Sequence, residues 1–266
     1  MNIHRLREFV ASFQETDGRI TSEPCVKATA EFLLVHRLCP HICTGNVESA
    51  RSFLQEYLPV SASREVKKGV SSLESIWQIA VGIPEATVHL SEAFTDIACS
   101  SVTPSIKSAL LLVLWLQKYS DPRLQTVLSE VISYQHTLFS RPTLDSLYET
   151  THNCMTFWAG ISHSHASQCM NILKKSGEWL SSHVLSCAYC IDLLSEVLGI
   201  LLLVPVPSPV YHIAFSVLEK SQNSDGGVPL FAGGDSAFHA SLVTLWAQTA
   251  YATYEMEMRS KNQEVK

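Results

Sequence analysis

Apolar residues recur every three to four positions along most of the chain, and no convincing run alternates apolar with polar residues. The first spacing is typical of amphipathic helices, whereas strict alternation would indicate strands. Helix start signals, a Ser or Thr with Pro in the first turn, stand in "SVTPSIKSALL" and "SRPTLDSLYE". The pattern predicts helices over residues 3–14, 24–38, 46–58, 64–81, 85–99, 104–119, 121–136, 142–159, 165–184, 186–203, 208–222 and 236–258.

These elements predict an all-α fold. No long polar or Gly/Ser-rich linker divides the chain, so we expect a single domain over residues 1–266. Twelve helices joined by short loops can form six helical hairpins. An open solenoid usually carries polar outer faces on its terminal repeats, and the end segments here are as apolar as the middle. A closed barrel of about six hairpins, an α/α toroid, therefore fits better.

A short internal similarity supports repeated hairpins. The stretch "FQETDGRI" near the N-terminus aligns with "SQNSDGGV" near the C-terminus, and an amphipathic helix precedes and follows each copy. The matched pairs are Gln14 with Gln222, Asp17 with Asp225 and Gly18 with Gly226. Asp and Gly suit a turn, and a Gln amide can bond loop backbone groups, so we interpret these residues as structural staples of a turn that closes the ring.

The composition narrows the class of protein. Of the 266 residues, 46% are hydrophobic and 17% are charged, which indicates much buried surface. The formal net charge is −6 and no Lys/Arg run exceeds a pair, so we expect no nucleic-acid partner and no anionic membrane partner. The N-terminus does not look like a signal peptide, and the apolar segments are too short or too Pro-broken to span a bilayer. We expect a soluble cytoplasmic protein whose eight cysteines are mostly reduced and buried.

Two carboxylates interrupt an otherwise apolar predicted helix. Asp192 and Glu196 in "LSCAYCIDLLSEVLGILLLV" are four residues apart and share one helix face, with Ser195 beside them. Burial disfavours the charged form of a carboxyl group, which is the usual preparation for general-acid work. The alternative is that both side chains brace the ends of neighbouring helices.

A second group of reactive side chains lies in "LDSLYETTHNCMTFW". On a helix, Asp145, Glu149 and His152 fall at i, i+4 and i+7, and Tyr148 lies four residues before His152. His152, Glu149 and Tyr148 can all transfer protons, whereas Asp145 is expected to be solvated. The alternative is an ordinary helix start whose acidic residues complement the dipole.

His239 opens the last predicted helix, just after the repeat turn. Its register counterpart in the first repeat is Lys27, so the fold alone does not require an imidazole there. At the rim of a ring, His239 would be a third member of the site. It could equally be a half-exposed residue at a helix start.

Zinc is a weaker possibility. His183, Cys187 and Cys190 fall at i, i+4 and i+7, and further Cys and His residues stand in "CPHIC" and "SHSHAS". None of these shows a standard pair of Cys-x-x-Cys units, and free Cys is commonly a buried apolar filler. We therefore expect no metal and no organic cofactor.

The repeat turn carries a resemblance to a known superfamily. Gln-x-x-Asp-Gly-Gly, followed by a loop and the aromatic-His pair of "FHASLVTLWA", resembles the repeat turn of the α/α toroids, which include squalene-type terpene cyclases and protein prenyltransferase β subunits. The segments from Tyr148 to Trp246 are similar, in order, to an uncharacterised bacterial family of toroid relatives. The resemblance implies an α/α barrel with a central cavity, but it does not imply an activity. The chain lacks the Asp-x-Asp-Asp of the cyclases, the Asp-rich magnesium motif and the Cys-His-Gly of lanthionine cyclases.

These observations favour a small-molecule enzyme that works by cofactor-free acid–base chemistry. His152, helped by Glu149 or Tyr148, would move a proton, and Asp192 or Glu196 would be the complementary acid. The reaction would be a cyclisation, isomerisation or elimination of an apolar, polyketide- or terpenoid-like substrate in specialised biosynthesis. One alternative is a non-catalytic scaffold that holds a partner helix or a carrier protein. Another is a zinc-dependent transferase.

Overall fold

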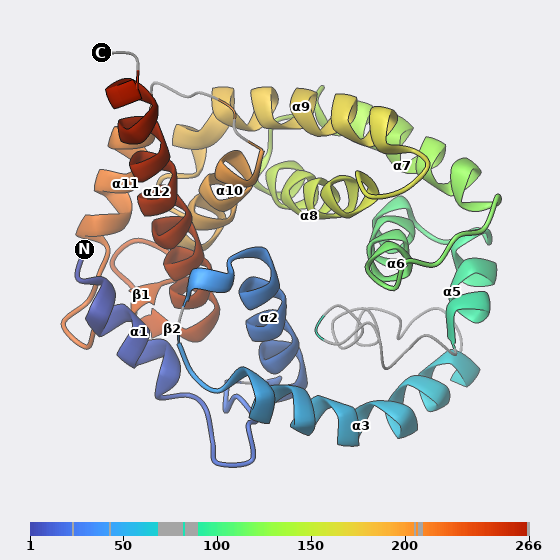
Figure 1. The fold of residues 1–266 in the computed structure, drawn as a ribbon, viewed down its shortest axis with the longest axis horizontal. Coiled ribbons are helices and arrows are strands. Elements are labelled where there is room, and N and C mark those ends of the chain that lie inside the picture. The colour runs from blue at the N-terminus through green and yellow to red at the C-terminus, as the bar shows by residue number, and fades with distance from the viewer. Residues whose placement is uncertain are drawn as a thin grey trace. The chain divides into compact units, whose positions relative to one another are not determined.

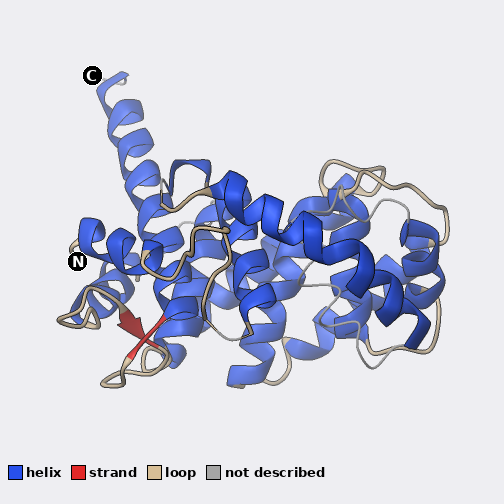
Figure 2. Ribbon diagram, turned by 90° about the horizontal axis from the view of Figure 1, so that it is seen from below, coloured by secondary structure: helices blue, strands red, loops and turns tan. Residues whose placement is uncertain are grey.

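The computed structural model describes residues 1–22, 24–42, 44–68, 82, 90–204, 206 and 210–264. These form helices joined by short loops, with one small two-stranded ribbon, so the all-α prediction is confirmed (Figure 2). The helices are α1 (Ile3–Ala11), α2 (Cys25–Leu38), α3 (Val47–Lys68), α5 (Ser91–Ala98), α6 (Pro104–Leu116), α7 (Leu124–Leu138), α8 (Leu144–Gly160), α9 (Ala166–His183), α10 (Ile191–Leu203), α11 (Tyr211–Lys220) and α12 (Phe238–Glu264). The shorter elements are the 3-10 turns η1 (Pro40–Ile42) and η4 (Val184–Cys187) and the strands β1 (Val228–Pro229) and β2 (Ser236–Ala237).

The chain divides into two compact units. The first unit comprises Met1–Phe13, Val35–Gly45 and Leu180–Lys266, and the second comprises Gln14–Leu34 and Asn46–Trp179. The single domain stays a prediction.

Helices α10 and α12 form the centre of the first unit, where they lie side by side and start at the same end (Figure 1). Every residue of α10 from Ile191 to Leu201 is buried. Inside this contact the Ser195 and Thr244 hydroxyl oxygens are 2.6 Å apart. Further along, α12 presses against the backbone of α10, because a Cβ atom on Gly199 would lie 2.7 Å from the Trp246 ring. The helices approach this closely because residue 199 has no side chain.

Helices α6, α7 and α8 pack together in the second unit. Buried hydroxyl and amide groups pair across their contacts: Ser108 with Thr156 at 3.0 Å, and Gln135 with Thr150 at 3.0 Å and Asn153 at 2.8 Å. Such pairing removes the cost of burying these polar groups.

The predicted helix start is confirmed at α6, whereas α8 begins two residues later than predicted, so that Pro142 lies before the N-cap residue rather than in the first turn. The Thr103 hydroxyl accepts from the backbone N–H of Ile106, with Pro104 at the first helical position. At α8, Thr143 and Ser146 form a reciprocal capping box. Both arrangements satisfy backbone donors that the first helical turn leaves unpaired.

The repeat turn recurs in both predicted copies, with the same bonds. The Gln14 amide bonds the carbonyl of Gly18 at 3.3 Å and that of Asn46 at 2.8 Å. In the later copy the Gln222 amide bonds Gly226 and Asn2, both at 2.9 Å. Asn46 and Asn2 each cap the start of a helix through their side chains. The predicted role of the Gln residues as staples is therefore confirmed.

The register of the two copies is also confirmed. The hydroxyl of Thr29 on α2 accepts the N–H of Ile20 at 3.0 Å, and that of Ser241 on α12 accepts the N–H of Val228 at 3.0 Å. Thr29 and Ser241 each lie two residues after the pair matched from sequence, Lys27 and His239.

Several predicted boundaries were wrong. A break was predicted between residues 58 and 64, but α3 continues through Pro59, because a proline removes only one backbone donor and good helix formers follow it in "ASREVKK". The helix predicted over 186–203 begins at Ile191, after the separate turn η4. The helix predicted over 236–258 begins at Phe238, because β2 pairs with β1. Residues 69–81, from the end of another predicted helix, lie outside the described residues.

Helix α6 ends three residues earlier than predicted, in a Schellman motif. The N–H of Lys118 bonds the Trp115 carbonyl, and that of Tyr119 bonds the Leu114 carbonyl, each at 2.9 Å. The motif requires a left-handed residue, and Lys118 takes this role with φ of 58°. Glycine is the usual residue at this position.

Candidate active site

Three of the residues predicted from sequence meet at the start of α10 and α12. Asp192 lies in the first turn of α10, Glu196 lies one turn further along the same face, and His239 is the second residue of α12. All three belong to the first unit. Both carboxylates are buried, with 6% of each residue exposed, and the His239 side chain is 29% exposed.

The imidazole of His239 lies between the two carboxylates. Its Nδ1 is 2.7 Å from Oδ1 of Asp192, which is a hydrogen-bond distance. Its Nε2 is 3.9 Å from Oε1 of Glu196, which is too long for a direct hydrogen bond. An ionised carboxylate can only accept, so the proton of this bond belongs to Nδ1. The Nε2 lone pair of a neutral imidazole then faces Glu196.

The loop after β1 holds the start of α10. The N–H of Asp192 donates to the carbonyl of Leu230 at 3.3 Å, and the N–H of Ala232 donates to that of Tyr189 at 2.9 Å. A bridge pairs Cys190 with Phe231 on the same loop. The negative charge of Asp192 is stabilised further by the positive end of the α10 dipole. This loop and the α10–α12 contact together fix the position of the carboxylate.

The cluster is also capable of holding a divalent cation. One ligand atom from each of the three side chains lies within 4.8 Å of the others, and three protein ligands with further open positions are typical of catalytic metal sites. Tetrahedral ligation at zinc separates neighbouring donors by about 3.3 Å. The 2.7 Å between Nδ1 of His239 and Oδ1 of Asp192 is shorter, so this pair as it stands is a hydrogen bond. A cation would instead use Nε2 with Glu196, and Asp192 would orient the ring.

The second predicted group lies on α8, in the second unit. Glu149 accepts from the hydroxyl groups of Tyr134 and Ser105, the latter at 2.9 Å. Burial, and then the bond to Glu149, raises the pKa of Tyr134 to about 12. The sequence offered no signal for these two partners, because they come from α7 and α6.

Tyr148 is half-buried, like Glu149. The rings of Tyr148 and His152 are 6.5 Å apart between centroids, and His152 is exposed, as is Asp145. The bonds from Ser105 and Tyr134 join Glu149 to α6 and α7, and catalysis by Glu149, His152 or Tyr148 stays a prediction.

The weaker zinc candidates His183, Cys187 and Cys190 do not lie on one continuous helix, so their spacing does not place them on one helix face. Helix α9 ends at His183, and Cys187 and Cys190 follow in and after η4. Burial raises the pKa of the Cys187 thiol to about 12, which disfavours the thiolate that zinc requires. In the described part of the chain, the three do not form a metal-sized group. Cys43 of "CPHIC" lies outside the described residues.

Comparison with known proteins adds no family to this picture. No protein-family model, curated protein or solved structure matches the chain. Among the described residues, no helix combines the length and apolar character needed to cross a membrane.

Proposed function

We propose that the protein is a small-molecule enzyme whose reaction is driven by proton transfer at His239. The observation that carries this proposal is the position of the imidazole, with Nδ1 bonded to Asp192 at 2.7 Å and Nε2 directed to Glu196 at 3.9 Å. When a buried carboxylate accepts a hydrogen bond from one ring nitrogen of a histidine, the tautomer and orientation of the ring are fixed. General-base catalysis by the other ring nitrogen requires both.

Each side chain has a separate role in this proposal. Asp192 holds the proton on Nδ1, and Nε2 takes a proton from a C–H or O–H group of the substrate. Glu196, in its protonated form, returns a proton to another atom of the substrate. The 3.9 Å between Nε2 and Oε1 leaves both atoms able to contact one substrate group. In an isomerisation or cyclisation the net change is a proton shift, and in an elimination the proton from Glu196 departs with the leaving group; none of these needs a redox partner.

Exposed apolar side chains beside the cluster support an apolar substrate, polyketide- or terpenoid-like. Tyr189, Leu230 and Phe231 are 54%, 43% and 53% exposed, and the two aromatic rings stack at 6.1 Å. Backbone bonds tie this loop to Asp192. A role in specialised biosynthesis, with substrate on a carrier protein, belongs to the same proposal.

For the fold, we propose that the helices form an α/α toroid. It is supported by the repeat turn shared by the two copies, and by the bonds that join Gln222 to the N-cap residue Asn2 of the first helix. A ring needs such a joint between its first and last repeats.

A cation-dependent reaction is the second candidate, because Nε2 of His239 and Oε1 of Glu196 lie 3.9 Å apart within the metal-sized cluster. Glu196 and Nε2 of His239 would then bind the ion, and the ion would polarise a substrate oxygen. A scaffold without catalysis is the remaining alternative.

The test is the enzyme-dependent incorporation of deuterium from D₂O into a library of terpenoid alcohols and polyketide-like β-diketones, detected by mass spectrometry. We expect His239→Gln and Asp192→Asn each to reduce the labelling rate by about 10²–10⁴-fold, because both remove the oriented base. His4→Gln, on an exposed face of α1, is the matched control and should be without effect. Labelling that survives His239→Gln, or no labelling by the wild type, contradicts the proposal. Labelling abolished by EDTA and restored by a divalent cation favours the second candidate.

A further inference from the structure

A cavity of about 480 Å³ lies between the C-terminal ends of α6 and α8 in the second unit. Its volume is in the range of small-molecule sites. Trp115, Lys118, Trp158 and His163 are among the residues that line it. None of them belongs to the His239 cluster.

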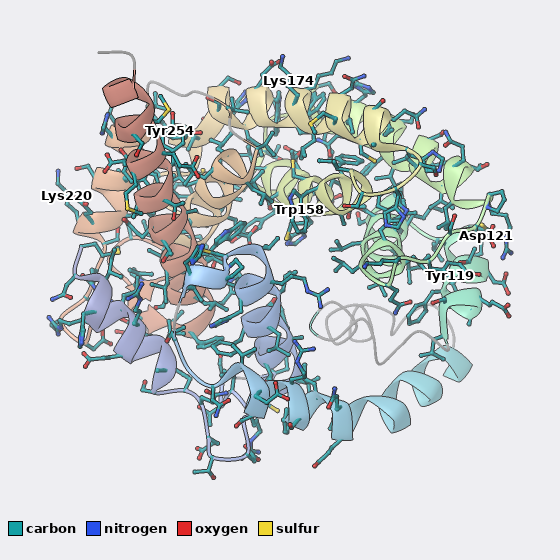
Figure 3. The ribbon with its side chains drawn as sticks, in the orientation of Figure 1. Tyr119, Asp121, Trp158, Lys174, Lys220 and Tyr254 are labelled. Atoms are coloured by element: carbon teal, nitrogen blue, oxygen red, sulfur yellow. The ribbon has the colours of Figure 1, made fainter. Side chains whose placement is uncertain are left out.

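The apolar wall of this cavity is fixed in place. Trp115 is 3% exposed and stacks on His163, with ring centroids 5.9 Å apart. Helix α8 lies directly on Trp115, because a Cβ atom on Gly160 would be 2.6 Å from that ring. Trp158, two residues before Gly160 on α8, is half-buried and contributes a second indole (Figure 3).

His163 completes the wall and has a defined tautomer. Its Nε2 is 2.9 Å from the carbonyl oxygen of Trp115. A carbonyl can only accept, so Nε2 carries the proton and donates. This bond fixes the loop that follows α8, whose "ISHSHASQ" sequence is otherwise unexplained.

Lys118 adds a positive charge at the same place. It occupies the left-handed position of the Schellman motif, where a side chain is disfavoured and Gly is usual. Its ammonium group makes no ion pair with any residue in the described ranges. A cation beside two indoles complements a ligand that is flat, apolar and negatively charged.

We propose that this cavity binds an aromatic carboxylate, with its ring against the indole of Trp158 and its carboxylate on the ammonium group of Lys118. This site is separate from the proposed reaction and does not depend on it. The ligand class of this cavity is a planar anion, whereas the His239 cluster does not require its substrate to be planar or charged.

The test is a titration with 2-naphthoate, followed by NMR of the indole N–H signals of the five tryptophans. Signals are assigned with single Trp→Phe variants. We expect saturable shifts at Trp158 and Trp115, and weaker binding of the uncharged 2-naphthylmethanol. Saturable shifts confined to other indoles, or no shift at millimolar ligand, overturn the proposal.

Variants separate the contribution of the Lys118 charge to binding from that of the Trp158 ring. Lys118→Gly should weaken 2-naphthoate binding about three- to fivefold, as expected for a solvent-accessible ion pair, and leave 2-naphthylmethanol unchanged. Because Gly suits φ of 58°, this variant should be at least as stable as the wild type, so a loss of binding is not misfolding. Trp158→Leu should weaken the binding of both ligands about tenfold.

The matched control is Lys174→Ala on the exposed side of α9 (Figure 3). Equal affinity for both ligands, or an unchanged Lys118→Gly, contradicts the site.

Discussion

Each ring nitrogen of His239 faces a different buried carboxylate, and this asymmetry decides what the residue can do. The bond to Asp192 fixes one nitrogen as a donor and leaves the other as a base. The first repeat places Lys27 at the same register position, so the turn and its helix form without an imidazole. The turn therefore does not require the imidazole, which is consistent with the proton-transfer role proposed for it.

A single glycine sets the contact between the two helices that carry the site. We expect Gly199→Ala to destabilise the protein by about 1–3 kcal/mol, because its Cβ would lie 2.7 Å from the Trp246 ring and outweigh the better helix propensity of Ala. The free energy of unfolding in urea measures this. In a Trp246→Leu background the same substitution should be neutral or stabilising. An equal cost in both backgrounds would contradict the contact.

The site residues were partly predictable from the sequence. Asp192 and Glu196 were identified because two carboxylates in an apolar helix are costly to bury, and His239 because the repeat register made it unexpected. The bond between His239 and Asp192 could not be predicted, since the two are 47 residues apart and only the packing of α10 on α12 joins them. The bonds from Ser105 and Tyr134 to Glu149 could not be predicted for the same reason.

The repeat turn is the clearest feature at the scale of elements, because one Gln holds its own turn and the cap of another helix. We expect Gln222→Ala to lower the free energy of unfolding by about 1–3 kcal/mol, since it removes the bonds to Gly226 and to both backbone groups of Asn2. Urea unfolding measures the loss. Gln168→Ala, an exposed residue of α9, is the control and should cost little. Equal effects of the two variants would show that the turn bonds do not stabilise the fold.

Helices were predictable as elements, and their junctions were less so. Hydrophobic periodicity and cap residues locate α6 and α8 within a few residues. The early end of α6 was not predicted, because a Lys in a left-handed conformation has no sequence signature. The continuation of α3 through Pro59 and the β1–β2 ribbon depend on context that periodicity does not report.

Ionisable thiol and phenol groups removed from solvent make the free energy of unfolding of the whole molecule depend on pH in the alkaline range. Burial raises the pKa of Cys154 and of Cys187 from 9.0 to about 12, and that of Tyr134 to about 12. Each folded-state pKa lies above its unfolded value, so folding favours the protonated form. The resulting stability is complete below the unfolded pKa and is lost as the pH rises through the folded pKa.

We therefore expect the free energy of unfolding to fall steadily between about pH 9 and pH 12. Urea unfolding at several alkaline pH values measures the slope. Cys187→Ala should make this slope shallower, whereas Cys99→Ala, at an exposed thiol, should leave it unchanged. Stability that rises over this range, or equal slopes in both variants, would contradict the burial of these groups.

The tautomer of His239 is the most direct test of the proton-transfer site. Long-range ¹H–¹⁵N NMR of ¹⁵N-histidine protein distinguishes the two ring nitrogens at a pH where the imidazole is neutral, and His239→Gln assigns the signals. The proposed site predicts a protonated Nδ1 and an unprotonated Nε2, with the preference weakened in Asp192→Asn. A proton on Nε2 would contradict it, because the nitrogen directed toward Glu196 would then have no lone pair to act as a base.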